Sequence, residues 1–414
     1  MEGEPGARGD GRDPPILTVR DLRVVFETDR ETVRAVDGVD FDVVPGETVG
    51  IVGESGSGKT VTARSIMGLV DAPGRVLSGS SVRFHDRRTV RAFAERFPKR
   101  TVELGWASDA EDRPAVADAP GVEPDDCVFV TGGDPDRPGR ITDGFIELTR
   151  LDGEPQRAIR GGNVAMVFQD PQTSLNPVYT VGNQIVEAVR LHRDRRGQAA
   201  KRTAIELLEA VGIPDAGRRF GEHPHQFSGG MRQRAVIAMA LACDPDVLIC
   251  DEPTTALDVT IQAQILDLLA ELQERRDLAI VFITHDMGVI AEVSDRVNVM
   301  YAGEIVESAG VRSLFESPKH PYTRGLLRSI PGRTDGDRLE TIPGRVPTPN
   351  EPPRSCRFAP RCPKAFDECE AVHPVPVPVE ADIDDHTAAC LLYPEDRPTA
   401  DAVGSHRDRG GGDE

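Results

Sequence analysis

Gly53-Glu54-Ser55-Gly56-Ser57-Gly58-Lys59-Thr60 is the stretch that decides the fold of this chain. It matches the phosphate-binding pattern G-x-x-x-x-G-K-[ST] at every fixed position. The apolar run 48–52 before it predicts a buried strand, and residues 61–69 after it have the spacing of a helix. A strand, a glycine loop and a helix in this order predict a loop that binds the phosphates of a nucleotide.

Each residue type in this loop has a chemical reason. Glycines let consecutive backbone N–H groups point at a phosphate, and the positive N-terminus of the following helix attracts the same anion. Lys59 is expected to reach the β- and γ-phosphates, and the Thr60 hydroxyl to coordinate Mg²⁺. The alternative, a glycine-rich turn that matches by chance, does not explain the flanking strand and helix. The expected ATP contacts are Gly53, Glu54, Ser55, Gly56, Ser57, Gly58, Lys59 and Thr60.

The bulk composition narrows the class of protein. A chain of 414 residues has room for one large α/β domain and something smaller. A net charge of −20 argues against a broad basic surface for DNA or RNA, so we expect no nucleic-acid partner. No apolar stretch approaches the roughly 20 residues that span a bilayer, and no apolar segment near the N-terminus has the pattern of a secretory signal. We therefore expect a cytosolic protein that is soluble or peripheral to a membrane.

Hydrophobic patterning divides the chain into four parts. Residues 1–15 are polar and glycine-rich and are predicted to be a disordered leader. In residues 16–330 apolar strands alternate with helices, which predicts a doubly wound α/β core. Residues 331–394 begin as a Pro/Gly-rich linker and then carry four cysteines. Residues 395–414 are predicted to be a disordered tail.

Three regions within 16–330 differ from one another. Alternating apolar and polar residues over 16–44 predict antiparallel strands at the N-terminus. The pattern decays over about 84–143, where Asp, Pro and Gly are frequent, so we expect a surface insertion that is mainly a solvated loop. Only short pieces of it, such as 127–130, have the composition of strands. Helical segments over about 170–235 predict a helical subdomain.

A second nucleotide signal is the pair Asp251-Glu252, which follows the apolar run 246–250. An aspartate at the end of a buried strand beside the phosphate loop can hold Mg²⁺, and the adjacent Glu252 can polarise a water molecule for in-line attack on the γ-phosphate. Two carboxylates at a strand end can also be merely solvated, but the glycine loop favours a catalytic role. Gln169 and His285 also end predicted strands, and His285 is placed where it could touch the γ-phosphate.

The stretch Ser228-Gly229-Gly230 directly precedes a predicted helix. Its backbone amides and the helix dipole would form a second anion site. One nucleotide needs a single cradle for its γ-phosphate. We therefore expect this second site to act on a nucleotide that is held by another subunit.

Taken together and in this order, the motifs resemble the ATP-binding subunit of ABC transporters over about residues 16–330. The resemblance implies a P-loop NTPase core with an N-terminal antiparallel β-subdomain, a helical subdomain and a head-to-tail dimer with a second ABC ATPase subunit. It also implies that Gln169 touches Mg²⁺ and the attacking water, that Asp258 links the two ATP sites, and that His285 holds the γ-phosphate. Phe26 resembles the aromatic residue that stacks on adenine, although a core position explains it equally well.

Three further stretches resemble the oligopeptide and dipeptide importers, namely 168–177, 227–234 and 317–323. The signature departs from the commonest family form by having Phe227 and Met231, but its Ser-Gly-Gly is intact. The resemblance implies an ATP hydrolase on the cytoplasmic face of the cell membrane, which works with two transmembrane permease subunits and, indirectly, with an extracytoplasmic solute-binding protein. The alternatives are a related importer of nickel or another small solute, and a soluble ABC ATPase unconnected to transport.

The cysteines near the C-terminus form the pattern C-x5-C-x6-C-x20-C. Thiolates with loop spacing in a reducing compartment suit a four-ligand site for either zinc or a four-iron four-sulfur cluster. The blocks 342–344 and 356–362 resemble the C-terminal extension of peptide-importer ATPases, and this resemblance implies an iron–sulfur cluster. Unligated thiols in a small apolar knot are the alternative. The candidate ligands are Cys356, Cys362, Cys369 and Cys390.

Overall fold

The computed structural model describes residues 13–28, 31–104, 119, 121–170, 174–193, 195–255, 257–330, 342–379, 386–395 and 398–410. Most of the expected leader, and residues 331–341 of the expected linker, therefore lie outside the described residues. None of the helices in the described ranges combines the length and the apolar composition needed to cross a bilayer.

The larger sheet of the described chain has eight strands in the order β14-β15-β13-β12-β3-β11-β10-β9. Its centre is parallel, and every residue of β3, β9, β10 and β11 is buried, as expected for strands that are covered on both faces. The carboxyl ends of these strands lie at one edge of the sheet. The strands are β3 (Thr48–Val52), β9 (Val164–Val167), β10 (Val247–Asp251), β11 (Ala279–Thr284), β12 (Arg296–Tyr301), β13 (Glu304–Gly310), β14 (Val377–Pro378) and β15 (Thr387–Ala388).

The smaller sheet is built around the long N-terminal hairpin, in the order β2-β1-β5-β8-β7-β6, with β4 paired to β1. All its pairings are antiparallel except β6 with β7. The predicted N-terminal antiparallel β-subdomain is thus confirmed. Its strands are β1 (Leu17–Glu27), β2 (Thr32–Val43), β4 (Gly74–Val76), β5 (Ser81–Phe84), β6 (Thr101–Glu103), β7 (Val128–Gly132) and β8 (Asp143–Glu147).

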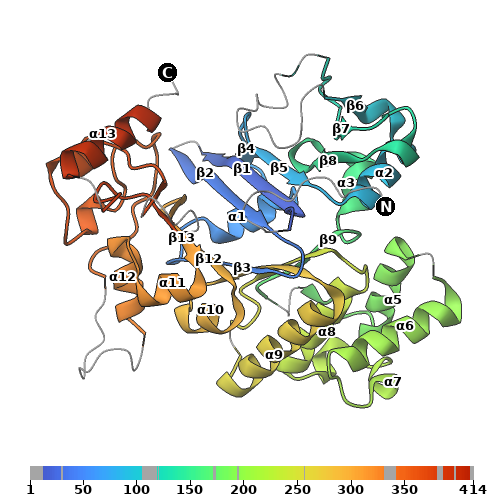
Figure 1. Ribbon diagram of the computed structural model, residues 1–414. Coiled ribbons are helices and arrows are strands. Elements are labelled where there is room, and N and C mark those ends of the chain that lie inside the picture. The colour runs from blue at the N-terminus through green and yellow to red at the C-terminus, as the bar shows by residue number, and fades with distance from the viewer. Residues whose placement is uncertain are drawn as a thin grey trace, which may run out of the picture.

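Two hydrophobic clusters cover the two faces of the larger sheet. Side chains alternate along β10, so that Ile249 joins the cluster with the smaller sheet and α1, whereas Leu248 and Cys250 join the cluster with the helices. Figure 1 shows this layering, with α1 and β1 on one side of β3 and with α8 and α9 on the other. Both faces of the larger sheet are therefore packed, and this packing fixes the edge at which the carboxyl ends of its parallel strands lead into loops.

The helical subdomain lies beyond the edge strand β9 in Figure 1 and consists of α5 to α8. Its apolar stripes, which include Ile185, Leu208 and Ile237, pack into the helix-side cluster. The helices are α1 (Lys59–Ile66), α2 (Arg87–Arg96), α3 (Gly153–Ile159), α5 (Val181–His192), α6 (Gly197–Ala210), α7 (Ala216–Arg219), α8 (Gly229–Leu241), α9 (Val259–Arg276), α10 (Met287–Val293), α11 (Val311–Glu316), α12 (Pro321–Arg328) and α13 (Thr399–Gly410).

The insertion over 84–143 is folded wherever the structure describes it, which corrects the expectation of a solvated loop. Helix α2 begins at Asp86, whose side chain accepts a hydrogen bond from the Thr89 N–H. Strand β7 pairs with β8, and Phe129 stacks on Phe145 at 5.3 Å between ring centroids. The strands are too short, and the helix too rich in charge, to give a periodic signal over a window of ordinary length.

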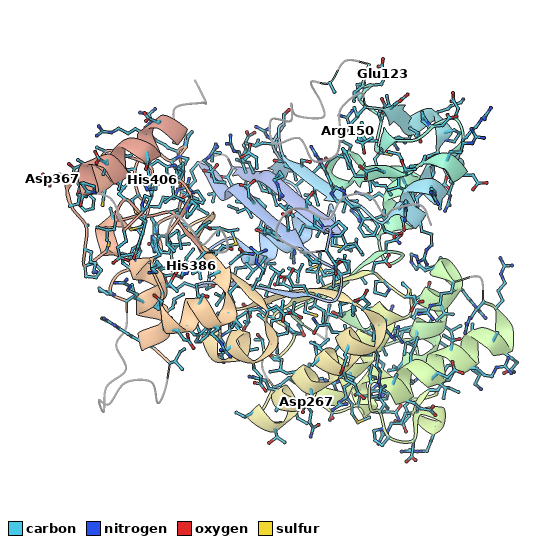
Figure 2. All side chains as sticks on the ribbon, viewed as in Figure 1. Glu123, Arg150, Asp267, Asp367, His386 and His406 are labelled. Carbon is cyan, nitrogen blue, oxygen red and sulfur yellow. The ribbon has the colours of Figure 1, made fainter. Side chains whose placement is uncertain are left out.

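The C-terminal residues add two short strands to the edge of the larger sheet. Strand β15 pairs with β13, and β14 pairs with β15. Helix α13 follows, and its Ala402, Val403 and His406 are buried. Over Thr399–Gly410 this helix corrects the expectation of a disordered tail at 395–414, and the rest of that tail lies mostly outside the described residues. Three buried positions on one helical face among polar neighbours give too weak a periodic signal to predict the helix. Figure 2 shows His386 and His406 within this part of the molecule.

Candidate active site

The loop 53–60 connects β3 to α1, as the sequence predicts. At two positions of the loop only glycine fits, because the backbone of a neighbouring strand occupies the space that a Cβ would need. Gly58 has a φ of 104°, and a Cβ there would lie 2.3 Å from the Ala35 carbonyl oxygen of β2. A Cβ on Gly53 would lie 2.1 Å from the carbonyl oxygen of Met300 at β12. The loop is therefore shaped by the strands that surround it.

Lys59 curls back over the loop that it belongs to. Its Nζ donates hydrogen bonds to the backbone oxygens of Gly53 at 2.8 Å and Glu54 at 3.0 Å. Burial lowers the pKa of Lys59, and three nearby carboxylates oppose that effect. The fully buried Ser57 hydroxyl has no hydrogen-bond partner among the residues that the structure describes. A buried ammonium and an unsatisfied hydroxyl fit a loop that is built to accept phosphate oxygens.

Thr60 and Asp251 form the next layer of the site. The Thr60 hydroxyl donates a hydrogen bond to Asp251 Oδ1 at 3.0 Å. Asp251 ends β10 with only 2 % of its surface exposed, and burial raises the pKa of its carboxyl although the Thr60 hydrogen bond opposes this. A buried carboxylate beside a hydroxyl is stabilised by a hard cation, and these oxygens are the ligands that Mg²⁺ prefers. The residues therefore fit a Mg²⁺ site.

Glu252 is the centre of a small polar cluster. Its Oε2 accepts hydrogen bonds from Gln169 Nε2 at 3.0 Å and from the Thr255 hydroxyl at 2.9 Å, and its Oε1 lies 3.3 Å from His285 Nδ1. Burial acts to raise the pKa of Glu252, but the hydrogen bonds from Thr255 and His285 outweigh it, and the pKa is lowered. The carboxylate is therefore ionised at neutral pH, as a base that takes a proton from water must be.

The backbone at Glu252 is also unusual. Its φ is 48°, a left-handed conformation that a glutamate rarely adopts. The Glu252 N–H donates to the Ile283 carbonyl oxygen of β11 at 2.9 Å, which holds this conformation. Strain that is concentrated at the proposed base is typical of functional sites.

The signature Ser228-Gly229-Gly230 lies at the start of α8, and its residues do not join the cluster around Glu252. Ser228 Oγ accepts a hydrogen bond from the Met231 N–H at 3.3 Å, so it caps the helix. Asp258 caps α9 in the same way. A Cβ on Gly230 would lie 2.6 Å from Ile261 of α9, so the two helix starts are in contact. Ser228, Gly229 and Asp258 are exposed and can face another molecule.

Phe26 also lies apart from the catalytic cluster. It is half-buried in β1 and packs at the edge of the sheet-side hydrophobic cluster. A Cβ on Gly74 would lie 2.6 Å from its ring. Its stacking on adenine remains a prediction.

The four C-terminal cysteines line one small cavity together with Phe358. Burial raises the pKa of Cys356 and of Cys390 to about 12, and it also raises the pKa of Cys362 and Cys369. Within the described ranges, no three His, Cys, Asp or Glu side chains are grouped closely enough to hold a metal ion. The four thiols therefore border one cavity without being grouped as metal ligands, and burial favours their protonated form.

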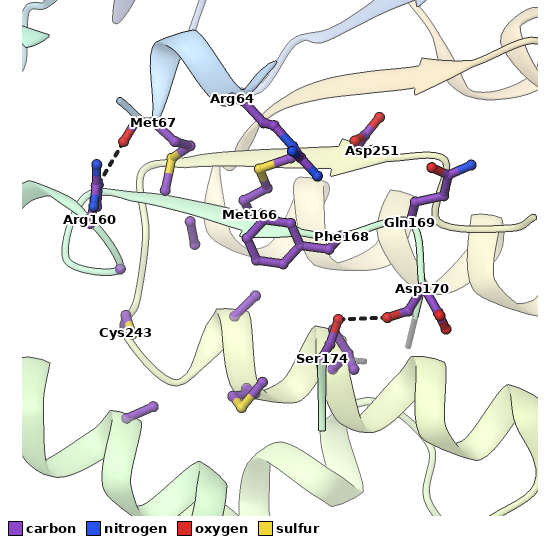
Figure 3. A pocket seen from close by; sticks show the side chains of 16 residues that line it. Arg64, Met67, Arg160, Met166, Phe168, Gln169, Asp170, Ser174, Cys243 and Asp251 are labelled. Atoms are coloured by element: carbon purple, nitrogen blue, oxygen red, sulfur yellow. Dashed lines mark hydrogen bonds between the residues drawn. The ribbon is translucent and has the colours of Figure 1, made fainter. Parts of the chain in front are cut away.

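A groove of about 700 Å³ opens beside Gln169 and Asp251 (Figure 3). It lies between β9 and the helices α1, α5 and α8, and Met67, Met166 and Met239 line it. The hydroxyl of Ser174 donates to the Asp170 carbonyl oxygen across one end at 2.8 Å. Flexible methionine side chains suit a surface that adapts to an apolar partner.

Sequence reasoning missed three side chains that contact the candidate site. Thr255 supports Glu252, and its hydroxyl three residues after a glutamate in a turn is a signal that can be found. Arg361 and Tyr322 contact the phosphate loop at Glu54 from hundreds of residues away. Their sequence carries no signal for that contact.

Comparison with known proteins agrees with this geometry. A family model described as "ABC transporter" matches residues 36–112 and 130–255, and one described as "Oligopeptide/dipeptide transporter, C-terminal region" matches residues 306–369. The oligopeptide transport ATP-binding protein AppD of Bacillus subtilis is 42% identical over 383 residues, which cover 92% of this chain and 98% of that protein. The dipeptide transport ATP-binding protein DppD of the same organism is 42% identical over 400 residues, which cover 95% and 99%.

A solved structure supports the fold. The dimeric, post-hydrolysis ATP-binding cassette MJ0796 bound to ADP and Pi superposes with a TM-score of 0.51 at 22% identity, and it covers 72% of this chain and 99% of that one. The predicted ABC ATPase fold is thereby confirmed. The chain therefore belongs to the ABC transporter ATP-binding proteins of the oligopeptide/dipeptide transporter family.

Proposed function

We propose that this chain is the ATP-hydrolysing subunit of an importer for oligopeptides or dipeptides. The observation that carries the hydrolase assignment is the convergence of Gln169, Thr255 and His285 on the ionised carboxylate of Glu252, next to the Thr60–Asp251 pair. The peptide assignment is supported by the relatives, which are named for oligopeptide and dipeptide transport.

The chemistry follows from the placement of these groups. Backbone N–H groups of the loop 53–60 and Lys59 bind the phosphates of ATP, and Lys59 exchanges its two carbonyl partners for phosphate oxygens. Thr60, Asp251 and Gln169 would hold Mg²⁺, which would supply positive charge to neutralise the phosphates. Glu252 accepts a proton from the attacking water, and His285 holds the γ-phosphate.

The exposed helix starts at Ser228 and Asp258 are proposed to complete the ATP site of a second ABC ATPase subunit, either a copy of this chain or a paralogue. Val259, directly after Asp258, is 82% exposed, and an apolar side chain at this position favours contact with another protein. MJ0796, which shares the fold, is described as a dimer. The proposed arrangement is a head-to-tail pair in which each nucleotide touches the loop 53–60 of one chain and the signature of the other.

We further propose that the groove beside Gln169 faces two transmembrane permease subunits at the cytoplasmic face of the cell membrane. Val178 and Tyr179, between Gln169 and α5, are 72% and 56% exposed. The methionine-lined groove lies beside Gln169, whose side chain contacts the base Glu252. The conformation of a permease bound there would be coupled, through Gln169, to whether the ATP site holds nucleotide. The solute-binding protein would contact the permease and not this chain.

The cysteine cavity is proposed to hold either an iron–sulfur cluster or zinc. Four thiols around one cavity are a suitable donor set, and metal binding would require their deprotonation and a closer approach of the side chains. Metal analysis and an absorption spectrum of anaerobically purified protein test this proposal. A broad visible band that disappears in Cys356→Ser supports iron, a colourless preparation with stoichiometric zinc supports zinc, and a metal-free protein rejects both.

The hydrolase assignment is tested by Glu252→Gln, which keeps the shape and the hydrogen-bond acceptor but removes the base. We expect turnover to be abolished while ATP binding and ATP-dependent dimerisation persist. Glu274→Gln on the exposed side of α9 is the matched control and should hydrolyse ATP normally. Normal hydrolysis by Glu252→Gln would reject Glu252 as the base.

The transport assignment needs a different experiment. We expect this chain to co-purify with a permease complex whose ATPase activity in proteoliposomes rises when peptide and its binding protein are added. Stimulation by nickel and not by peptide would favour the small-solute alternative. Failure to assemble with any membrane protein would favour a soluble ABC ATPase.

A further inference from the structure

The phosphate loop is held from outside by residues near the C-terminus. Arg361 Nη1 donates to Glu54 Oε2 at 2.7 Å, and Nη2 donates to Oε1 at 3.0 Å, so the pair is bidentate. The Glu54 N–H donates to the Tyr322 hydroxyl at 2.9 Å. The second residue of the loop is therefore fixed at both its backbone and its side chain.

Arg361 is itself held rigidly. Its side chain is only 5% exposed, and its Nε donates to the Pro343 carbonyl oxygen at 2.8 Å. Its guanidinium carbon lies 5.6 Å from the centre of the Tyr301 ring, and Nη1 donates to the Tyr301 hydroxyl at 3.3 Å. The hydrogen bond with Glu54 raises the pKa of Arg361 above its usual value. The charge is therefore permanent and its direction is fixed.

The charge of Glu54 conflicts with a loop that binds a polyanion. Glu54 immediately follows Gly53, and its carbonyl oxygen already contacts Lys59 Nζ, so an unpaired carboxylate here would act against the phosphates of ATP. A bidentate arginine neutralises the carboxylate and fixes its orientation. The ion pair and the Tyr322 hydrogen bond also restrain the position of residue 54 in a loop whose N–H groups must point at the phosphates.

Contacts to the neighbouring strand support the same role. Arg357 Nη2 donates to Asp37 Oδ2 of β2 at 2.5 Å, and the Arg34 N–H of β2 donates to the Pro349 carbonyl oxygen at 2.8 Å. Strand β2 carries Ala35, whose carbonyl oxygen packs against Gly58. The residues after 342 thus hold the loop directly and also hold the strand behind it.

We propose that Arg361 is a positioning residue for ATP binding and that, through Glu54 and with Tyr322, it makes the C-terminal extension a structural part of the nucleotide site. This inference rests on the assignment of the loop 53–60 to ATP. The extension then does more than cover a sheet edge. It sets how readily the loop accepts ATP.

A double-mutant cycle between Arg361 and Glu54 tests the proposal in the full-length protein. The measurements are the Kd of a fluorescent ATP analogue, the KM and kcat of ATP hydrolysis, and the melting temperature. For Arg361→Gln we expect Kd and KM to rise about tenfold, the size of one uncompensated charge near a protein surface, while kcat changes less than about twofold. Arg361→Lys should give an intermediate Kd, because lysine keeps the charge but cannot make a bidentate pair.

The double variant Glu54→Gln/Arg361→Gln decides between a role of Arg361 through the Glu54 carboxylate and a role in folding alone. A role through Glu54 predicts that removing the carboxylate restores Kd to within about threefold of the parent protein, because no charge is left unpaired beside the loop. A double variant that binds ATP as weakly as Arg361→Gln alone would overturn the proposal. So would a Kd for Arg361→Gln that equals that of Arg354→Gln, the control at an exposed arginine of the same segment.

Lys59→Ala separates this inference from the proposed function. If the parent protein binds ATP and Lys59→Ala does not, the loop is the ATP site, and the Arg361 data then test the inference alone. If Lys59→Ala binds ATP as well as the parent, the site assignment fails and the inference fails with it.

Discussion

The Thr60 hydroxyl and the Asp251 carboxylate are 3.0 Å apart although 191 positions separate them in the chain. Strands β3 and β10 both pair in parallel with β11, so their carboxyl ends reach the same edge of the sheet. The first helical turn after β3 therefore contacts the last residue of β10. This contact places a hydroxyl and a buried carboxylate where the phosphates of a nucleotide in the loop would end.

Replacing Thr60 by valine tests this pair as a Mg²⁺ site. Thr60→Val keeps the shape but removes a ligand, so the Mg²⁺ concentration that gives half-maximal ATPase activity should rise about tenfold or more, in the range of one lost oxygen ligand or its support. The measurement is a Mg²⁺ titration at saturating ATP. An unchanged Mg²⁺ requirement would contradict the assignment.

The pH profile of hydrolysis should report the partners of Glu252. Burial alone would raise the pKa of Glu252, but the hydrogen bonds from Thr255 and His285 lower it below the ordinary 4.5. The base is thus ionised down to acidic pH, and activity that depends on it is lost only as pH falls through this lowered pKa. In His285→Ala the pKa of Glu252 should rise, and the acid limb of kcat should move to higher pH.

Thr255→Val should move the acid limb in the same direction while leaving the proposed γ-phosphate contact of His285 in place. Measuring kcat between about pH 3.5 and 8 at saturating ATP and Mg²⁺ compares the three proteins, because the range must extend below the ordinary Glu pKa. If both variants lose activity equally at every pH, these residues act without changing the ionisation of Glu252.

The sequence predicts those residues of the site that lie at the carboxyl ends of neighbouring parallel strands. Each of Gln169, Asp251 and His285 follows an apolar run, and the carboxyl ends of parallel strands must lie side by side. Their proximity to the loop 53–60 therefore follows from topology. The roles of individual side chains, and the stacking of Phe26 on a base, do not follow from topology and stay predictions.

The contacts that the sequence does not predict are made by single side chains over long distances. Arg361 and Tyr322 reach Glu54 from irregular or short elements, which have no periodicity that fixes a direction. Helix α13 buries only a few residues among charged ones, so its mean composition is that of a solvated segment. The insertion hides its short strands in the same way. Local composition predicts exposure poorly when a few residues carry the packing.

Phe129 tests whether the insertion is a folded unit. It is fully buried and stacks on Phe145. Phe129→Ala should lower the free energy of unfolding of this region by about 3–5 kcal/mol, the usual cost of removing a buried phenylalanine. Urea unfolding followed by circular dichroism measures it, with exposed Arg140→Ala as control. Because this aromatic pair belongs to a cluster separate from the one beneath the loop 53–60, kcat should stay unchanged well below the melting temperature.

His320 should make stability depend on pH. Its ring is buried, and its Nδ1 accepts the Tyr322 N–H at 3.1 Å, so it caps the helix that carries the Tyr322 hydroxyl to Glu54. Burial lowers the pKa of His320 to about 4, and the attraction of Glu307 only partly opposes this. The neutral ring is therefore part of the folded state. Its contribution is complete above the unfolded pKa of 6.5 and is lost as pH falls from 6.5 towards 4.

His320→Asn keeps a cap acceptor but cannot titrate. Between pH 7.5 and 5, the parent protein should lose about 2 kcal/mol more free energy of unfolding than this variant, because each pH unit below 6.5 costs about 1.4 kcal/mol for one buried neutral histidine. Urea unfolding at both pH values gives the difference, and His225→Asn at an exposed position should behave like the parent. Equal losses in the parent and in His320→Asn would mean that the ring is protonated without cost, and then the cap at α12 cannot depend on the lone pair of Nδ1.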